Sequence, residues 1–232
     1  MSFAASVDTA ANTNPEVVRE LVRLCLEAKA ASVQVLDHAF REGTQPLAYS
    51  GILAACNSIA EGCCHNRTRS RYYKSFTLNN AKSMHENAAM IDVLEADVLI
   101  ACPVAKSHSS TGVSLSLKGQ MGLIYDRGCM HGRYDLDTAI VDLAFALKPS
   151  LTIIDASRVM STNGPMGPGK VLQPGEIIAS ADPVAADAFA VSSYPWYGRT
   201  IKPRQVAHIA QAHARGLGRM DIDHLSVQRV LL

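Results

Sequence analysis

Two apolar runs constrain the fold of this chain more than any other feature of its sequence. The segments DVLIACP at 97–103 and SLTIIDA at 150–156 carry mostly apolar side chains. Such runs are typical of strands buried on both faces, as when helices cover both sides of a parallel sheet. Shorter strand patterns at 32–36 and 176–180 alternate with helical patterns. We therefore predict an α/β fold, with a mostly parallel sheet flanked by helices.

Helical periodicity and capping signals locate the helices between these strands. Asn14 before Pro15, and Asp182 before Pro183, each supply an N-cap and a proline at the first helical position. Helical patterns lie at 15–29, 50–60, 86–94, 136–147, 182–194 and 203–215, and 106–122 is expected to be a loop followed by a helix. The basic stretch 65–85 is expected at the surface, and the terminal SVQRVLL is expected to form an edge strand.

Length and composition bound the class of protein. We predict a single domain over 1–232, with a polar lead-in at 1–14 and a smaller subdomain near 38–90. The formal net charge of +1 provides no global field for nucleic acid or an anionic membrane. No apolar run reaches the roughly 18 residues that a spanning helix needs, and no signal-peptide pattern opens the chain. As given, the chain is expected to be soluble and cytoplasmic.

The six cysteines do not form a recognisable framework. The pattern Cys56-x6-Cys63-Cys64-His65 matches no standard zinc or iron–sulfur spacing, and the chain contains no CxxC. We expect these cysteines to be buried near a helix end, where a thiol packs as a small hydrophobic group.

Polar residues follow each predicted strand. Asp37 and His38 end the first strand, Lys106 and His108 follow the second, and Asp155 ends the third. Ligands of open α/β sheets bind beyond the carboxyl ends of the strands, so these positions predict a pocket for a small anion. The alternative is that the aspartates are only caps or turn formers.

The segment 106–133 holds the main candidates for chemistry. We assign His108 as a general base and Lys118 as a residue that holds substrate or cofactor; the alternative for Lys118 is a lysine that snorkels to the surface. The remaining ligand-binding candidates are Lys106, Ser110, Thr111, Arg127, Asp155 and Lys170. Lys106 and Arg127 suit a carboxylate, and the hydroxyls suit an anion at a helix N-terminus.

The segment NGPMGPGK at 163–170 fits the letters of a phosphate-binding loop, but we reject that function. Val171 stands where a magnesium-binding Ser or Thr is required, and Pro165 and Pro168 remove N–H donors. A mobile loop near the site, with Lys170 contacting a phosphate or carboxylate, is the better hypothesis; a plain surface loop is the alternative.

Several blocks resemble the family called domain of unknown function 362. They include ADVLIACPVAKSHSSTGVSLSLKGQMG, LTIIDASRVMSTNGPMGPG and ASADPVAADAFA. The variant with PVAK is most similar to members exported by the twin-arginine route, and other members are fused to ferredoxin-type modules. The resemblance implies a first strand and an export signal upstream of Met1, and an iron–sulfur redox partner. Without that first strand, the sheet is expected either to have an uncovered edge or to pair with another chain, as in a homodimer.

A more distant similarity links the segment to the N-terminal domain of nickel-pincer lactate racemases. That family has a histidine, nine residues and then a lysine, which His108 and Lys118 reproduce after Ala96-Asp97. The similarity implies a later histidine as metal ligand, here His131, with nickel or iron as the metal. The family's Gly-Thr-His-Arg-Pro and Gly-Tyr-Ser-Gly-Gly segments are absent, so only a shared pocket of His108, Lys118 and His131 carries over.

Three functions remain open from the sequence. The first is an enzyme that performs acid/base catalysis on a small hydroxy or oxo acid. The second is a non-catalytic metal- or anion-binding protein that works with an iron–sulfur partner. The third is a structural dimer whose polar core only specifies the fold.

Overall fold

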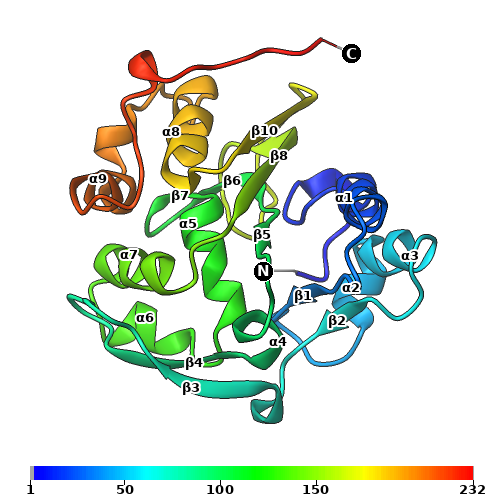
Figure 1. Cartoon of the computed structure of the whole chain (residues 1–232). Helices are drawn as coiled ribbons and strands as arrows, with labels where there is room; N and C mark the ends of the chain where they lie inside the picture. The colour runs from blue at the N-terminus through cyan, green and yellow to red at the C-terminus, as the bar shows by residue number, and fades with distance from the viewer. Residues whose placement is uncertain (1–2, 232) are drawn as a thin grey trace.

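A computed structural model describes residues 3–231 of the chain (Figure 1). Its main sheet has the order β10-β8-β6-β7, formed by Glu176–Ser180, Leu151–Met160, Val104–His108 and Gly112–Ser114. The short strands β5 (Ile100–Ala101) and β9 (Val171–Leu172) also pair with β8. Strands β5 and β6 run parallel to β8, and β7, β9 and β10 join antiparallel. The predicted α/β class is confirmed, with parallel pairing at the centre of the sheet.

Helices α7 (Leu136–Ala146), α8 (Pro183–Ser193) and α9 (Ala207–Ala214) pack on one side of this sheet (Figure 1). Asp182 caps α8 as predicted, because its side chain accepts from the N–H groups of Val184 and Ala185. The main core joins Ile154 of β8 to apolar side chains of all three helices. The strand 176–180 and the helices near 136–147 and 182–194 therefore match their sequence signals.

The N-terminal segment covers the other side of the sheet. Phe3, Ala10 and Ala11 are buried against Val104 and Met160, and the segment contains the single-turn helix η1 (Val7–Thr9). The described part of the polar lead-in is therefore packed against the sheet. Its apolar side chains fill the face of β6 and β8 that the helices leave open.

A second, smaller core lies between α1 and the segment after it. Helices α1 (Pro15–Glu27), α2 (Gln45–Tyr49) and α3 (Ile52–Asn57) pack beside the parallel pair β1 (Val35–Asp37) and β2 (Cys64–Asn66). This core contains Val18, Val22, Leu47, Ile52, Cys56, Cys63 and Cys64. These three cysteines are free and buried, as the sequence predicts.

Four local predictions are wrong. The predicted helix 86–94 is a strand, β4 (Glu86–Met90), followed by the one-turn helix α4 (Ile91–Leu94). Strand β4 pairs with β3 (Tyr73–Thr77), which lies within the basic stretch 65–85. The predicted strand 97–103 is reduced to β5, and the longer strand starts at 104. The expected loop at 106–111 is part of a β-hairpin, β6–β7. Residues 226–231 form no strand.

Pairing with another strand accounts for the differences at 86–94 and 106–111. Short apolar segments fit a helix or a strand equally well, so a partner strand decides between them. At 102–103 the chain cannot continue a regular ladder, because Pro103 has no N–H and the Cys102 carbonyl accepts from the hydroxyl of Thr13.

The remaining elements are short. They are η2 (Ser70–Tyr72), α5 (Ser116–Gly119), η3 (Gln120–Leu123), α6 (Gly128–Gly132), η4 (Pro203–Gln205) and η5 (Ile222–His224). Within residues 3–231 no helix has the length and apolar character needed to cross a bilayer.

Candidate functional site

The β6–β7 hairpin and the short helices after it bring basic side chains together. Alternation along β6 places Lys106 and His108 on the same face of the strand. The group that we call the basic cluster consists of Lys106, His108, Lys118, Arg127 and His131. Lys106, His108 and Lys118 are each only 5% exposed. The ring of His131, on α6, stacks on that of His108 with 6.0 Å between centroids.

Electrostatic interactions show that the cluster occupies one region. The positive charge of Lys118 acts on Lys106, His108 and His131, and the charge of Arg127 acts on Lys118. The structure thus brings His108, Lys118 and His131 into one region, and the pocket that they were expected to share stays a prediction. Lys106 and Arg127, predicted as ligand-binding residues, belong to the same group.

Burial and mutual repulsion lower the pKa values of the cluster. Burial lowers the pKa of Lys106 to about 7, with a further contribution from Lys118. Burial lowers the pKa of Lys118 to about 8, and Arg127 adds to this effect. Burial, followed by Lys118 and His131, lowers the pKa of His108 to about 3. The protein thus holds two lysines and a histidine where their charged forms are disfavoured.

One wall of the site comes from the end of β1, as predicted for the first strand. The negative charge of Asp37 acts on Lys106 and on Arg127 and favours their charged forms. The guanidinium of Arg127 donates to the carbonyl of His38 at 2.6 Å. The ring of His38 lies near that of Tyr73, with 5.7 Å between centroids. Five basic groups thus lie near few acidic ones.

The hydrogen bonds of His108 determine which of its nitrogens carries the proton. The backbone N–H of Ser110 donates to His108 Nδ1 at 3.1 Å. An amide N–H is only a donor, so Nδ1 must accept and the neutral ring carries its proton on Nε2. Together with the low pKa, this makes His108 a neutral hydrogen-bond donor at Nε2. That role differs from the general base expected from sequence.

Ser110 and Thr111 do not lie at a helix N-terminus, and this expectation is wrong. Both are in the turn of the β6–β7 hairpin, because residues 112–114 form a strand. The hydroxyl of Thr111 donates to the carbonyl of Val113 at 3.0 Å, and so stabilises the turn itself. Ser110 contributes to the site through its backbone N–H rather than through its side chain.

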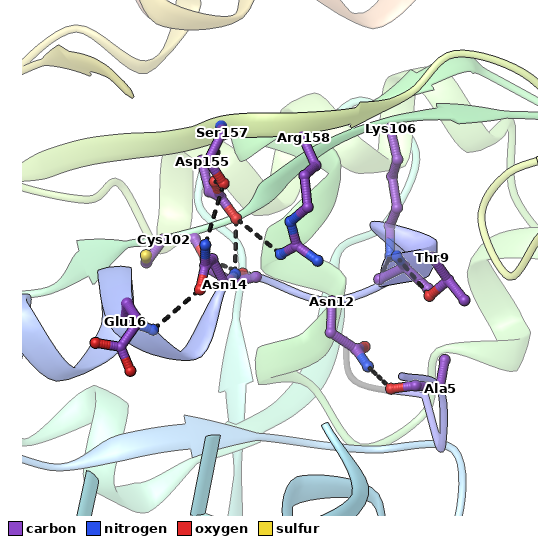
Figure 2. Close-up of polar contacts among 12 residues, drawn as sticks. Ala5, Thr9, Asn12, Asn14, Glu16, Cys102, Lys106, Asp155, Ser157 and Arg158 are labelled. Atoms are coloured by element: carbon purple, nitrogen blue, oxygen red, sulfur yellow. Dashed lines mark hydrogen bonds and ion pairs between the residues drawn. The ribbon is translucent and has the colours of Figure 1, made fainter. Parts of the chain in front are cut away.

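Asp155 is brought to the N-terminal segment instead of to the basic cluster (Figure 2). It is fully buried and accepts from the backbone N–H of Asn14 at 2.7 Å and from the hydroxyl of Ser157 at 2.6 Å. Figure 2 also shows Lys106 reaching this segment, where its Nζ donates to the carbonyl of Ala11 at 2.5 Å. Asp155 thus anchors the chain that covers one side of the site.

The loop that carries Lys170 is tied to the sheet. The backbone N–H of Gly164 donates to Ser107 Oγ at 2.9 Å, and a Cβ at Gly164 would lie 1.9 Å from the Ser107 carbonyl oxygen. Lys170 is exposed, and its backbone N–H donates to Thr162. Only a glycine allows this close approach of the loop to β6. A ligand contact by Lys170 stays a prediction.

The donor set around His131 bears on the predicted metal. The stacked rings of His108 and His131 supply two imidazoles, and the described residues contain no group of three or more His, Cys, Asp or Glu side chains that could hold a metal ion. The thiol of Cys129, on the same helix, donates to the carbonyl of Asp126. The described residues around His131 therefore do not by themselves make a metal site. The role of His131 as a metal ligand stays a prediction.

Sequence reasoning missed two residues that border the cluster, Asp137 and His208. The charge of Asp137 acts on Lys118, and that of His208 acts on His108. The two residues are 71 positions apart, and each lies in the first turn of an observed helix, α7 or α9, so no local motif connects them.

A protein-family model matches most of the chain. The model of a family described as domain of unknown function (DUF362) matches residues 1–192. No curated protein matches the chain.

Proposed function

Because the chain belongs to the family described as domain of unknown function 362, which assigns no activity, we propose a function from the basic cluster itself. We infer that the cluster binds a small carboxylate anion, a hydroxy or oxo acid, at the end of β6. Two buried lysines and a buried neutral histidine beside them carry this proposal: Lys106, Lys118 and His108.

The free energy of the cluster explains why an anion would bind. In the free protein, burial and repulsion make the charged lysines unfavourable. A carboxylate placed among them would add to the counter-charge of Asp37 and Asp137 in a medium of low dielectric, where the attraction is stronger than in water. Binding would raise the pKa values of both lysines. Near neutral pH, the protein would therefore take up protons as it binds the anion.

A buried amide two residues after Lys118 in the sequence also lacks a partner. The side chain of Gln120 is 3% exposed, and neither its oxygen nor its nitrogen has a hydrogen-bond partner among the described residues. Buried amides are nearly always paired with protein, water or ligand. A water or a ligand at η3 would supply that partner.

The residues divide into two roles toward such an acid. Lys106, Lys118 and Arg127 supply charge for the carboxylate. Neutral His108 donates from Nε2 to the hydroxyl or carbonyl oxygen of the ligand, so that it can polarise that bond without bringing another charge. Lys118, with a pKa of about 8, exchanges its proton near neutral pH, which suits proton transfer to or from a bound acid.

The non-catalytic alternative uses the same cluster. A carrier that holds an anion for an iron–sulfur partner requires binding but no turnover. Binding assays therefore test the site under either function, and incubation of the loaded protein with product analysis by NMR then separates enzyme from carrier.

The experiment is calorimetric titration of the purified protein with 2-hydroxybutyrate and 2-oxobutyrate. We expect Lys106→Met and Lys118→Met each to weaken binding by roughly tenfold or more, since a charge-assisted hydrogen bond contributes about 1.5–3 kcal/mol. Lys74→Met, at an exposed lysine of β3, is the matched control and should bind like the wild type. Absence of binding by both acids, or equal affinity in all four proteins, would refute the proposal.

A further inference from the structure

A cavity lies between the N-terminal segment, the start of α1 and the end of α2. Residues 6–8, 14–16 and 48–51 line it, together with Arg158 of β8. None of these residues belongs to the basic cluster. The volume of the cavity is about 590 Å³, which is within the range of roughly 300–1,000 Å³ typical of small-molecule sites. The cavity is therefore large enough for a ligand of its own.

The guanidinium of Arg158 lacks hydrogen bonds. All three of its nitrogens are buried, and none has a hydrogen-bond partner among residues 3–231. Its ion pair with Asp155 spans 3.8 Å from Nη2 to Oδ2 (Figure 2), which is too long for a hydrogen bond. The oxygens of Asp155 instead accept from the backbone N–H of Asn14 and from Ser157. Because buried donors are nearly always paired, we expect ligand or water oxygens at Arg158.

The lining of the cavity carries charges of both signs. Asp8 and Glu16 line it together with Arg158. Glu16 Oε2 is already paired with Arg19 at 2.7 Å, which leaves Asp8 as the carboxylate for a cationic group. A purely anionic ligand would be repelled by Asp8 and Asp155, and a purely cationic one by Arg158. A ligand with one charge of each sign matches the lining without changing its net charge.

Apolar surface completes the lining. Val7, Ala48 and Tyr49 contribute side chains to it, and Tyr49 is 64% exposed. An aromatic side chain with an exposed face offers a large contact area to an apolar group of a ligand. The cavity thus combines a cation, an anion and apolar side chains, which are the groups that recognise the three parts of an apolar amino acid.

We propose that this cavity binds a free amino acid, with its α-carboxylate on the guanidinium of Arg158 and its ammonium group on Asp8. A planar guanidinium and a carboxylate form two parallel hydrogen bonds, so the ligand would pair buried donors that the protein leaves unused. The side chain of the amino acid lies against Tyr49. This site goes beyond the proposed function, because it takes a different ligand on residues outside the basic cluster.

The first test uses the wild-type protein and needs no variant. Calorimetry compares L-phenylalanine with L-phenylalaninamide, which lacks the carboxylate, and with N-acetyl-L-phenylalanine, which lacks the ammonium group. The free amino acid should bind roughly tenfold or more tightly than either analogue, since each analogue loses a charge-assisted contact. Absence of L-phenylalanine binding would mean that only water pairs with Arg158 and would overturn the inference. Equal affinity for all three compounds would overturn it as well.

The second test locates the bound amino acid with variants. Arg158→Lys keeps the charge but loses the planar fork, and Asp8→Asn removes the anion; each should weaken binding of L-phenylalanine about tenfold. Arg204→Lys and Asp223→Asn, at exposed positions, are the matched controls and should bind like the wild type.

A variant of the basic cluster separates this site from the proposed anion site. Lys118→Met should bind L-phenylalanine like the wild type while it loses affinity for 2-hydroxybutyrate. Loss of L-phenylalanine binding in Lys118→Met, with unchanged binding in Arg158→Lys, would place the amino acid at the basic cluster and overturn the inference. The proposed function would stand in that case.

Discussion

Burial of Lys118 makes the stability of the free protein depend on pH in an unusual direction. The pKa of this lysine is lowered from 10.5 to about 8, chiefly by burial and then by Arg127. In the unfolded chain the group keeps its ordinary pKa. Between these two values the unfolded state binds more protons than the folded state, so the free energy of unfolding must rise with pH.

The size of the effect follows from this shift. Each pKa unit corresponds to about 1.4 kcal/mol, so a charged Lys118 destabilises the fold by roughly 3 kcal/mol below about pH 8. That penalty is fully present below the folded pKa and disappears as the pH rises toward 10.5. From about pH 7.5 to 9.5 the free energy of unfolding should increase by about 2 kcal/mol through this residue alone. Lys106, with a pKa of about 7, acts in the same direction.

Urea denaturation at pH values across this window measures the effect. Lys118→Met should be more stable than the wild type at about pH 7, because an apolar side chain of similar length replaces a buried charge. Its stability should also depend less on pH. Lys74→Met, at an exposed lysine, should follow the wild-type curve. A wild-type stability that stays constant or falls between about pH 7.5 and 9.5, with Lys118→Met less stable at every pH, would refute the reasoning.

Three further predictions concern the frame around the site. Gly164→Ala should lower the free energy of unfolding by about 1–3 kcal/mol in urea titrations, because its Cβ would lie 1.9 Å from a carbonyl oxygen of β6. The control is Gly132→Ala, whose Cβ meets nothing within 4 Å and which should have little effect. Equal losses of stability in the two variants would contradict this prediction. Asp142→Asn should cost about 3–5 kcal/mol, since this buried carboxylate pairs with Arg215 at 2.8 Å and accepts three backbone N–H groups. Burial raises the pKa of Asp142, but those hydrogen bonds outweigh it and lower the pKa below its ordinary value. The stabilisation by this carboxylate is therefore lost only as the pH falls below about 4. Thermal melts that show no acid-sensitive difference between the wild type and the variant would rule this out. Asp155→Asn should speed hydrogen exchange in the N-terminal segment, measured by mass spectrometry, and unchanged exchange at residues 10–14 would argue against its role as an anchor.

The sequence predictions are correct where neighbouring residues decide the structure, and they fail where a distant segment decides it. Helix α8 begins where Asp182 and Pro183 predict it, because capping is decided within one turn. Strand β10 matches its predicted range for a similar reason, as a short apolar run bounded by turn residues. The helix predicted at 86–94 fails because most of it pairs with 73–77, and no local pattern states which segment will supply a partner.

At the candidate site too, some properties follow from the local sequence and others only from tertiary contacts. Proximity of His108 and Lys118 could be expected from their positions after one strand and on the following helix. Their chemical states could not, because these depend on burial and on an N–H group in the hairpin turn. The pairing of Asp137 with His208 was not predictable, since it joins the first turns of two helices far apart in the chain.

By itself, the amino-acid sequence determined the α/β class, the positions of the well-capped helices, the family, and a concentration of basic residues after one strand. These follow from local periodicity, capping and order along the chain. Only the tertiary structure decided which segments pair, which basic side chains are buried together, and which nitrogen of His108 carries the proton. Those properties depend on solvent exclusion and on the folded backbone around each side chain, and the hypothesis of an anion site depends on them.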